Sequence, residues 1–159
     1  MMEPKFVDRE AFTVLGTQIH SMPDKLDFGS FWENTYMPLD AAIHPLSTDG
    51  AYYGVWFPHH ADGIPDYLAG MAVPDDAPAP EGTVKRQVPG SRFAVFECTI
   101  DEIGATYGYI YGTWLPASPY EFTPGGADFE YYPPEDVTDA SPAVWIPIRH
   151  KAGHEDDDD

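Results

Sequence analysis

Basic residues are scarce in this chain of 159 residues. Eight Lys and Arg side chains stand against 27 Asp and Glu side chains, which gives a formal net charge of −19. An acidic field of this kind repels the phosphate backbone of nucleic acids and anionic lipid surfaces alike. We therefore expect neither a direct nucleic-acid partner nor a membrane partner. The same composition is typical of salt-adapted proteins, so the charge alone does not separate salt adaptation from function.

Cysteine is nearly absent, and long apolar runs are missing. The single Cys98 excludes an internal disulfide and a multi-cysteine zinc cage, and next to Phe96 it is expected to be a small core residue. No apolar run approaches the roughly 20 residues that a membrane helix needs. The start, Met-Met-Glu-Pro, lacks the basic and apolar segments of a signal peptide. The sequence therefore predicts a soluble, cytoplasmic protein.

Familiar catalytic and metal-binding motifs are absent from the sequence. There is no Gly-rich phosphate loop and no Gly-x-Ser-x-Gly nucleophile motif. The neighbouring His59 and His60 would point to opposite faces of a strand, so they would chelate one ion poorly. We therefore predict no metal site and no cofactor.

The first half of the chain alternates between strand and helix patterns. Hydrophobic residues make up 43% of the sequence, which is enough for a folded core. Apolar and β-branched residues at 12–19 predict a strand. From Asp24, apolar residues recur every three or four positions, which predicts an amphipathic helix that Pro38 ends or kinks. Aromatic-rich stretches at 51–58 and 66–73 predict two more strands.

The second half repeats this order. Residues 92–99 predict a strand, and a capping-box pattern at 99–102 marks the start of a helix. An apolar stripe continues this helix until Pro116 stops it. Alternating residues at 128–132 and 143–149 predict two further strands.

The two halves predict a duplicated α+β fold. A Pro-rich linker at 74–82 separates pseudo-repeats at about 5–73 and 83–150, each with a βαββ order. We expect an antiparallel sheet with two main helices and a ligand pocket between the halves, because neither half has enough core by itself. Residues 1–150 are expected to form one domain, and the acidic tail at 151–159 is expected to be disordered.

Three glycines give the second predicted helix a nearly bare face. Gly104, Gly108 and Gly112 fall at every fourth position, and each costs about 1 kcal/mol in a helix relative to Ala. Two interpretations stay open. The helix packs closely on the sheet at these positions, or the missing side chains leave room for a flat ligand.

Glu130 is the acidic residue with the most informative surroundings. Strand alternation puts Glu130 and Tyr132 on one face, and Phe129 and Tyr131 on the other. The strand pattern by itself predicts that Glu130 is an ordinary exposed carboxylate. Trp145 on the next predicted strand and tyrosines on the predicted helix favour a functional role for Glu130. Ionised, it would hold a flat cation between ring faces. Desolvated, it would act as a general acid or base.

Short motifs along the chain resemble those of a known family. The resemblance runs in order from about Pro4 to Arg149, and it is carried by Phe12-Thr-Val-Leu-Gly16, Phe31-Trp32, Tyr53-Gly-Val55, Tyr67-Leu-Ala-Gly70, Val88-Pro-Gly-Ser-Arg-Phe-Ala-Val-Phe96, Thr106-Tyr107, Ile110-Tyr111, Trp114-Leu-Pro116, Phe129-Glu-Tyr131 and Val144-Trp-Ile-Pro-Ile148. The chain resembles the GyrI-like, or AraC-type, bacterial effector-binding domain, which also occurs in regulators that sense multiple drugs. The DNA-binding helix-turn-helix of such regulators has no counterpart in the sequence.

The resemblance implies a pocket that binds hydrophobic, aromatic and often cationic small molecules. By analogy with the family, Glu130 is expected at the pocket floor and Trp145 at a lining position. The remaining expected wall residues are Trp32, Tyr53, Tyr67, Tyr107, Tyr111 and Trp114.

Two alternatives stay open beside a binding role. Some members of the wider group resemble hydrolases that open strained cyclopropane rings, and Glu130 with Tyr107 or Tyr111 would then position the attacking water. The acidic surface would alternatively mimic a nucleic acid and occupy a basic protein partner, such as a topoisomerase.

Overall fold

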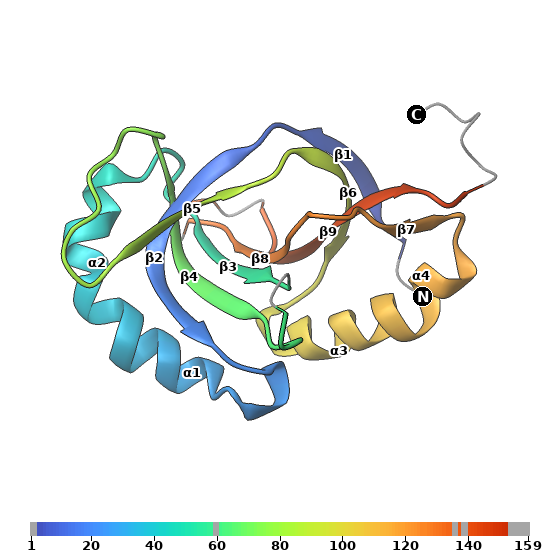
Figure 1. The fold of residues 1–159 in the computed structure, drawn as a ribbon, viewed down its shortest axis with the longest axis horizontal. Coiled ribbons are helices and arrows are strands. Elements are labelled where there is room, and N and C mark those ends of the chain that lie inside the picture. The colour runs from blue at the N-terminus through green and yellow to red at the C-terminus, as the bar shows by residue number, and fades with distance from the viewer. Residues whose placement is uncertain (1–2, 59–60, 135–136, 138–139, 153–159) are drawn as a thin grey trace.

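One antiparallel sheet organises the chain (Figure 1). The structure is a computed structural model that describes residues 3–58, 61–134, 137 and 140–152. Within these residues the sheet has nine strands in the order β1-β6-β9-β8-β3-β4-β2-β5, and β7 pairs with β9. The strands are β1 (Lys5–Arg9), β2 (Phe12–His20), β3 (Tyr52–Phe57), β4 (Asp66–Val73), β5 (Val84–Val88), β6 (Ser91–Glu97), β7 (Tyr120–Phe122), β8 (Asp128–Tyr132) and β9 (Ala143–His150).

The strand order shows the duplication. Exchanging β1 with β5, β2 with β6, β3 with β8 and β4 with β9 leaves the order of the sheet unchanged. The halves meet at the pairing of β3 with β8. The α+β fold with a repeated βαββ unit is therefore confirmed, and the six predicted strands are present with ends within two residues of those expected.

Three strands were not predicted, namely β1, β5 and β7. Strands β1 and β5 are short and charged, so their sequences carry little alternation. Each pairs with the first long strand of the other half, β1 with β6 and β5 with β2. Their extended form is therefore set by contacts between the halves, which local sequence does not reveal.

Two helical segments lie along the outside of the curved sheet (Figure 1). The first consists of α1 (Phe28–Ser30), a π-helical segment (Phe31–Tyr36) and α2 (Met37–Ile43). The second consists of a 3-10 turn (Ile100–Glu102), α3 (Ile103–Tyr109), a π-helical segment (Ile110–Trp114) and α4 (Leu115–Ala117).

The helix starts are set by side-chain caps. The first helix begins at Phe28 rather than at Asp24, because the Asp27 carboxylate accepts the backbone N–H of Ser30 at 3.0 Å. At the second helix the predicted capping box is confirmed, with the backbone N–H of Thr99 donating to Glu102 Oε1 at 3.0 Å.

Pro38 does not end the first helix, which continues to Ile43. A proline lacks the N–H for the bond to the residue four positions earlier, and its ring crowds that carbonyl. In both helices a π-helical segment precedes the proline, and the N–H of Met37 donates to the carbonyl of Trp32, five residues earlier. The wider turn accommodates the ring, so Pro38 and Pro116 both lie inside helices.

The hydrophobic core is divided by the sheet. One cluster contains strand side chains from both halves and no helix residue, and it includes Val14, Tyr53, Phe93 and Phe129. Two further clusters lie between the sheet and the helices, one in each half. Alternate residues of a strand therefore belong to different clusters, which decides which side chains can reach a site under the helices.

A pair of glycines allows β2 and β4 to approach closely. Gly16 and Gly70 are directly opposite in the ladder. A Cβ atom on Gly16 would lie 1.9 Å from the carbonyl oxygen of Ala69, and one on Gly70 would lie 2.1 Å from that of Leu15. Side chains at these positions would push the two strands apart.

Alanine substitutions at two glycines should therefore have opposite effects. Gly16→Ala is expected to lower the free energy of unfolding by about 3 kcal/mol or more. Gly108→Ala is expected to raise it by up to about 1 kcal/mol, because a Cβ there meets nothing within 4 Å and Ala is the better helix former. Urea unfolding followed by tryptophan fluorescence measures both, and a stable Gly16→Ala protein would contradict the close approach.

Candidate functional site

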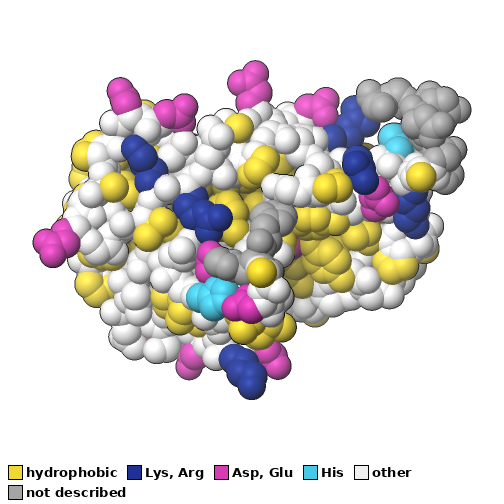
Figure 2. All heavy atoms as spheres, in the orientation of Figure 1, with side chains coloured by type: hydrophobic (Ala, Val, Ile, Leu, Met, Phe, Trp, Pro, Cys, Tyr) yellow, Lys and Arg dark blue, Asp and Glu magenta, His cyan; other side chains and the backbone are white. Residues whose placement is uncertain are grey.

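A cavity of about 1030 Å³ lies on the helix side of the sheet and is lined by both halves. The first half contributes Pro23, Asp24, Phe28, Trp56, Pro58 and Pro65, and the second contributes Ile100, Ile103, Gly104, Tyr107, Tyr111, Leu115, Phe122, Asp128, Glu130 and Tyr132. Hydrophobic side chains also gather over the sheet beside α3 on the face shown in Figure 2. A pocket between the halves, as expected for this fold, is thus present.

The Glu130 carboxylate lies at the inner end of this cavity and is only 2% exposed. Its Oε1 atom accepts the hydroxyl of Tyr67 at 2.9 Å and that of Tyr132 at 2.8 Å. Its Oε2 atom accepts Nε1–H of Trp56 at 3.3 Å and the hydroxyl of Tyr107 at 3.5 Å. Four donors from β3, β4, β8 and α3 therefore converge on one acidic side chain.

Strand register explains this convergence. Glu130 lies opposite Gly54 in the β3–β8 ladder, and residues directly opposite each other share a face of the sheet. A Cβ atom on Gly54 would lie 2.2 Å from the Tyr67 hydroxyl and 2.6 Å from Glu130 Oε1. The missing side chain at Gly54 therefore leaves the space in which the carboxylate meets its donors.

Asp128 is a second buried acid in the same cavity. It precedes Glu130 by two residues on β8, so both side chains lie on one face, and it is 7% exposed. The Tyr111 hydroxyl donates to Asp128 Oδ2 at 2.6 Å. Among the residues that the structure describes, neither carboxylate forms an ion pair.

Burial shifts the protonation of both acids. Desolvation raises the pKa of Glu130 to about 7, although the bonds from Tyr132, Tyr67 and Trp56 lower it in part. Desolvation also raises the pKa of Asp128 to about 6, against the lowering effect of the Tyr111 bond. The cavity thus holds acidic groups whose negative charge is not offset by a basic side chain of the described chain.

Aromatic rings form much of the cavity wall. The rings of Tyr107 and Tyr111 are one helical turn apart and nearly parallel, with 4° between their planes and 6.5 Å between centroids. Phe28 makes an edge contact with Trp56 at 5.9 Å. These side chains present ring faces and edges that suit flat apolar ligands and cations.

Five of the eight predicted site residues are in or next to the cavity. Glu130, Tyr107 and Tyr111 line it. Tyr67 and Trp32 lie behind this lining, where Tyr67 bonds Glu130 and Trp32 Nε1–H donates to the Tyr67 hydroxyl at 2.9 Å. The last two residues position the acid without contributing to the described wall.

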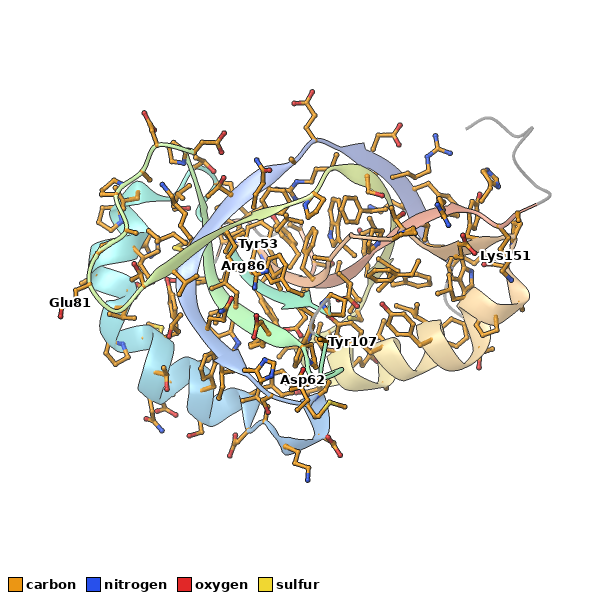
Figure 3. All side chains as sticks on the ribbon, in the orientation of Figure 1. Tyr53, Asp62, Glu81, Arg86, Tyr107 and Lys151 are labelled. Atoms are coloured by element: carbon orange, nitrogen blue, oxygen red, sulfur yellow. The ribbon has the colours of Figure 1, made fainter. Side chains whose placement is uncertain are left out.

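Trp145 and Tyr53 lie on the other face of the sheet. Trp145 is opposite Phe129, and the residue opposite Glu130 is Val144. Tyr53 is opposite Tyr131 in the β3–β8 ladder. In Figure 3 the Tyr53 side chain lies apart from that of Tyr107, which points from α3 toward the sheet. Antiparallel order alone does not fix the register, and a shift of one residue moves a side chain to the opposite face.

Trp114 also lies outside the described lining. It packs in the helix-side cluster of the second half, against Phe96 at 5.1 Å and Tyr120 at 6.1 Å. These contacts place it over its own half of the sheet, against β6 and β7, rather than at the cavity.

Several lining residues were not predicted from the sequence. Asp128 and Tyr132 are each two residues from Glu130 in β8. Strand alternation therefore places their side chains on the same face of the sheet as that of Glu130. The place of Trp56 in the lining is recognised only once the pairing of β3 with β8 is known, as is the space that Gly54 leaves behind the lining. Phe28 was assigned to the helix, with no indication that the start of this helix borders the pocket.

The glycines of the second helix do not mark close packing on the sheet, and that interpretation is wrong. A Cβ atom at Gly104, Gly108 or Gly112 would meet nothing within 4 Å. All three glycines are exposed, and Gly104 is the one among them that lines the cavity. Only Gly104 leaves room at the site.

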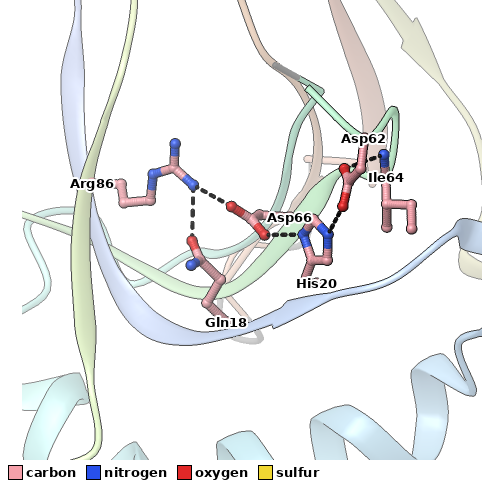
Figure 4. Close-up of polar contacts among 6 residues, drawn as sticks. All are labelled: Gln18, His20, Asp62, Ile64, Asp66 and Arg86. Atoms are coloured by element: carbon pink, nitrogen blue, oxygen red, sulfur yellow. Dashed lines mark hydrogen bonds and ion pairs between the residues drawn. The ribbon is translucent and has the colours of Figure 1, made fainter. Parts of the chain in front are cut away.

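A polar network connects two segments at the edge of the cavity (Figure 4). His20, at the end of β2, contacts Asp66 through Nδ1 and Asp62 through Nε2, both at 2.9 Å. Both bonds raise the pKa of His20. Arg86 donates to Asp66 at 3.1 Å and to Gln18 at 2.9 Å. The network holds Asp62 and Asp66, on either side of the lining residue Pro65, against the end of β2.

Metal ligands do not cluster in the part of the chain that the structure describes. No group of three or more His, Cys, Asp or Glu side chains is arranged to hold an ion there. His59, His60 and the predicted tail from residue 153 lie outside the described residues. No described helix is long and apolar enough to span a membrane.

Known proteins similar to this chain include an effector-binding family and a transcriptional regulator. Residues 5–148 match the family Cass2, described as integron-associated effector binding protein. The chain is 32% identical over 133 residues to the transcriptional regulator BrlR of Pseudomonas aeruginosa, covering 82% of this chain and 48% of BrlR. It therefore spans about half the length of that relative.

Two solved structures share the fold. SAV2435 bound to tetraphenylphosphonium aligns with a TM-score of 0.75 and 16% identity, over 98% of this chain and 99% of its own. The integron cassette protein VCH_CASS2 from the mobile metagenome of Vibrio cholerae aligns with a TM-score of 0.59 and 18% identity, over 94% and 96%. At these identities the likeness shows the fold alone. With its sequence match over residues 5–148, the chain belongs to the Cass2 family of integron-associated effector-binding proteins and has the GyrI-like effector-binding fold.

Proposed function

We propose that the chain binds hydrophobic, aromatic and often cationic small molecules in the cavity, with Glu130 as the residue that selects positive charge. One observation carries the proposal. Two buried carboxyl groups line an aromatic cavity, and neither has a basic partner among the described residues. A bound cation would supply the missing charge.

The physical basis is the low polarity of the site. An ionised carboxylate is costly to bury without a cation, and the attraction between opposite charges is stronger in such surroundings than in water. The faces of Tyr107, Tyr111 and Trp56 would add cation–π contacts and apolar contact area. A ligand with a positive charge on an aromatic frame would interact with both the carboxylates and the aromatic rings of the wall.

The relatives support the same class of ligand. The family is described as effector-binding, and SAV2435 has been solved with tetraphenylphosphonium, a lipophilic aromatic cation. The cavity of about 1030 Å³ has the size expected for a drug-sized molecule.

Replacing the central acid should weaken cation binding selectively. Tetraphenylphosphonium is expected to bind, and tetraphenylborate, which has the same shape and a negative charge, is expected to be rejected. Glu130→Gln should lower the affinity for the cation by about ten- to a hundredfold, because one charge-assisted contact is worth roughly 1.5–3 kcal/mol. Isothermal titration calorimetry measures these affinities.

Glu33→Gln is the matched control, because it removes the same charge from the exposed side of the first helix. Equal binding of the two tetraphenyl ions would show that apolar burial alone drives binding. A similar loss of affinity in both variants would assign the selectivity to net charge rather than to Glu130.

Acidification should stabilise the empty protein. The folded-state pKa is about 7 for Glu130 and about 6 for Asp128, both raised by desolvation above their unfolded values of about 4. Between pH 4 and 7 the folded state therefore binds more protons than the unfolded state, so the free energy of unfolding falls as pH rises. Thermal melts from pH 5 to 8 should show this slope, and Glu130→Gln should reduce it. An unchanged slope in the variant would contradict burial of the charged acid.

One observation favours a hydrolase as a second candidate. A carboxyl group with a pKa near 7 and a tyrosine hydroxyl 3.5 Å away is suited to general acid–base chemistry at neutral pH. Incubation with a strained cyclopropyl electrophile separates the candidates. Several turnovers per protein molecule, lost in a folded Glu130→Gln variant, would support the hydrolase, whereas stoichiometric binding without product would contradict it.

A further inference from the structure

Strand β8 and the second helix form two tyrosine–carboxyl pairs side by side. The Tyr107 hydroxyl reaches Glu130 Oε2 at 3.5 Å, and the Tyr111 hydroxyl reaches Asp128 Oδ2 at 2.6 Å. All four residues line the cavity. The second pair has no role in holding Glu130, so its presence needs a separate explanation.

The two pairs repeat because the helix and the strand have matching steps. Four residues along a helix advance by about 6 Å, and two residues along a strand advance by about 6.6–6.8 Å. The nearly parallel rings of Tyr107 and Tyr111, with centroids 6.5 Å apart, follow this spacing. The cavity wall therefore carries two buried acidic positions about 6–7 Å apart.

The surroundings of the two acids differ. Glu130 also accepts bonds from Tyr67, Tyr132 and Trp56. For Asp128, the one side-chain donor among the described residues is Tyr111, which is itself 39% exposed. Glu130 is thus enclosed by more donors than Asp128, although both acids are buried.

A ligand with one positive centre would leave one acid without a counter-charge. Both carboxyl groups are more than nine-tenths buried, and each would carry a desolvated negative charge when ionised. Because the two acids are about 6–7 Å apart, a cation in contact with Glu130 does not replace the water around Asp128 to the same extent. A second positive centre would satisfy the remaining acid in the same way as the first.

We propose that Asp128 forms a second cation subsite, held in position by Tyr111, and that the cavity prefers ligands with two positive centres spaced about 6–7 Å apart on a flat aromatic frame. This inference rests on the proposed function of the same cavity and adds the number and spacing of the ligand's charges.

Two biaryl compounds of nearly equal shape test the inference. The dication is 1,1′-dimethyl-4,4′-bipyridinium, and the monocation is 1-methyl-4-phenylpyridinium. Titration calorimetry on the whole chain at pH 8 and constant ionic strength measures both affinities. The wild-type protein is expected to bind the dication about tenfold or more tightly than the monocation.

Substitution of each acid separates the two subsites. Asp128→Asn is expected to lower the affinity for the dication about tenfold and that for the monocation less than twofold. Glu130→Gln is expected to weaken both compounds. Asp101→Asn, which removes one charge at the exposed start of the second helix, is the matched control and should leave the ratio of affinities unchanged.

The role of Tyr111 as a positioning residue has its own readout. The Tyr111 bond lowers the pKa of Asp128, so Tyr111→Phe should raise that pKa while keeping the ring. The pH at which dication affinity is half-maximal is therefore expected to move upward by more than that of the monocation, which depends on Asp128 only through its repulsion of the ionised Glu130. An unchanged dication profile would exclude this role.

The outcomes also separate this inference from the proposed function. A wild-type affinity ratio near one would overturn the second subsite, even if Asp128→Asn failed to fold. Equal losses of both compounds in a folded Asp128→Asn variant would do the same. Monocation binding that depends on Glu130 would still support the proposed function, whereas failure of both cations to bind would contradict the two proposals together.

Discussion

The burial of the Glu130 carboxylate at the meeting point of the two halves is the interaction on which the site depends. Four hydrogen bonds reach this acid, and Trp56 and Tyr67 come from one half while Tyr132 and Tyr107 come from the other. These donors replace water around the acid, but they bring no positive charge. The acid is therefore held in a fixed position and remains electrostatically incomplete, which is the condition that makes a cation a suitable ligand.

Duplication of the βαββ unit produces this arrangement. The central ladder of β3 with β8 joins the halves, and the exchanged edge strands β1 and β5 hold each half against the other. Each helix covers its own half of the sheet, so the space between the helices is left to the cavity. Neither half contains both the acid and its full set of donors, and the site exists only in the paired arrangement.

The sequence predicted those features that depend on local periodicity. Alternation identified the shared face of Glu130 and Tyr132, and the capping box marked the second helix. Register was not accessible, because it depends on which residues of different strands lie opposite each other, and Trp145 was therefore expected beside Glu130 although it faces the other cluster. The sequence left open whether Pro38 ends or kinks the first helix, which continues to Ile43, because the π-helical segment that accommodates the ring has no sequence signal of its own.

Overall acidity and the buried acids act over different ranges. The formal charge of −19 attracts every cation, but salt screens exposed charges beyond about 8 Å at physiological ionic strength. Glu130 and Asp128 are screened much less because they are buried, and they act only on a group that enters the cavity. Under the proposed function the surface would affect how often cations approach, whereas the spacing of the buried acids and the rings of Tyr107 and Tyr111 would determine which cations remain bound. The desolvation that disfavours the empty, ionised site would thus also be the source of the proposed selectivity.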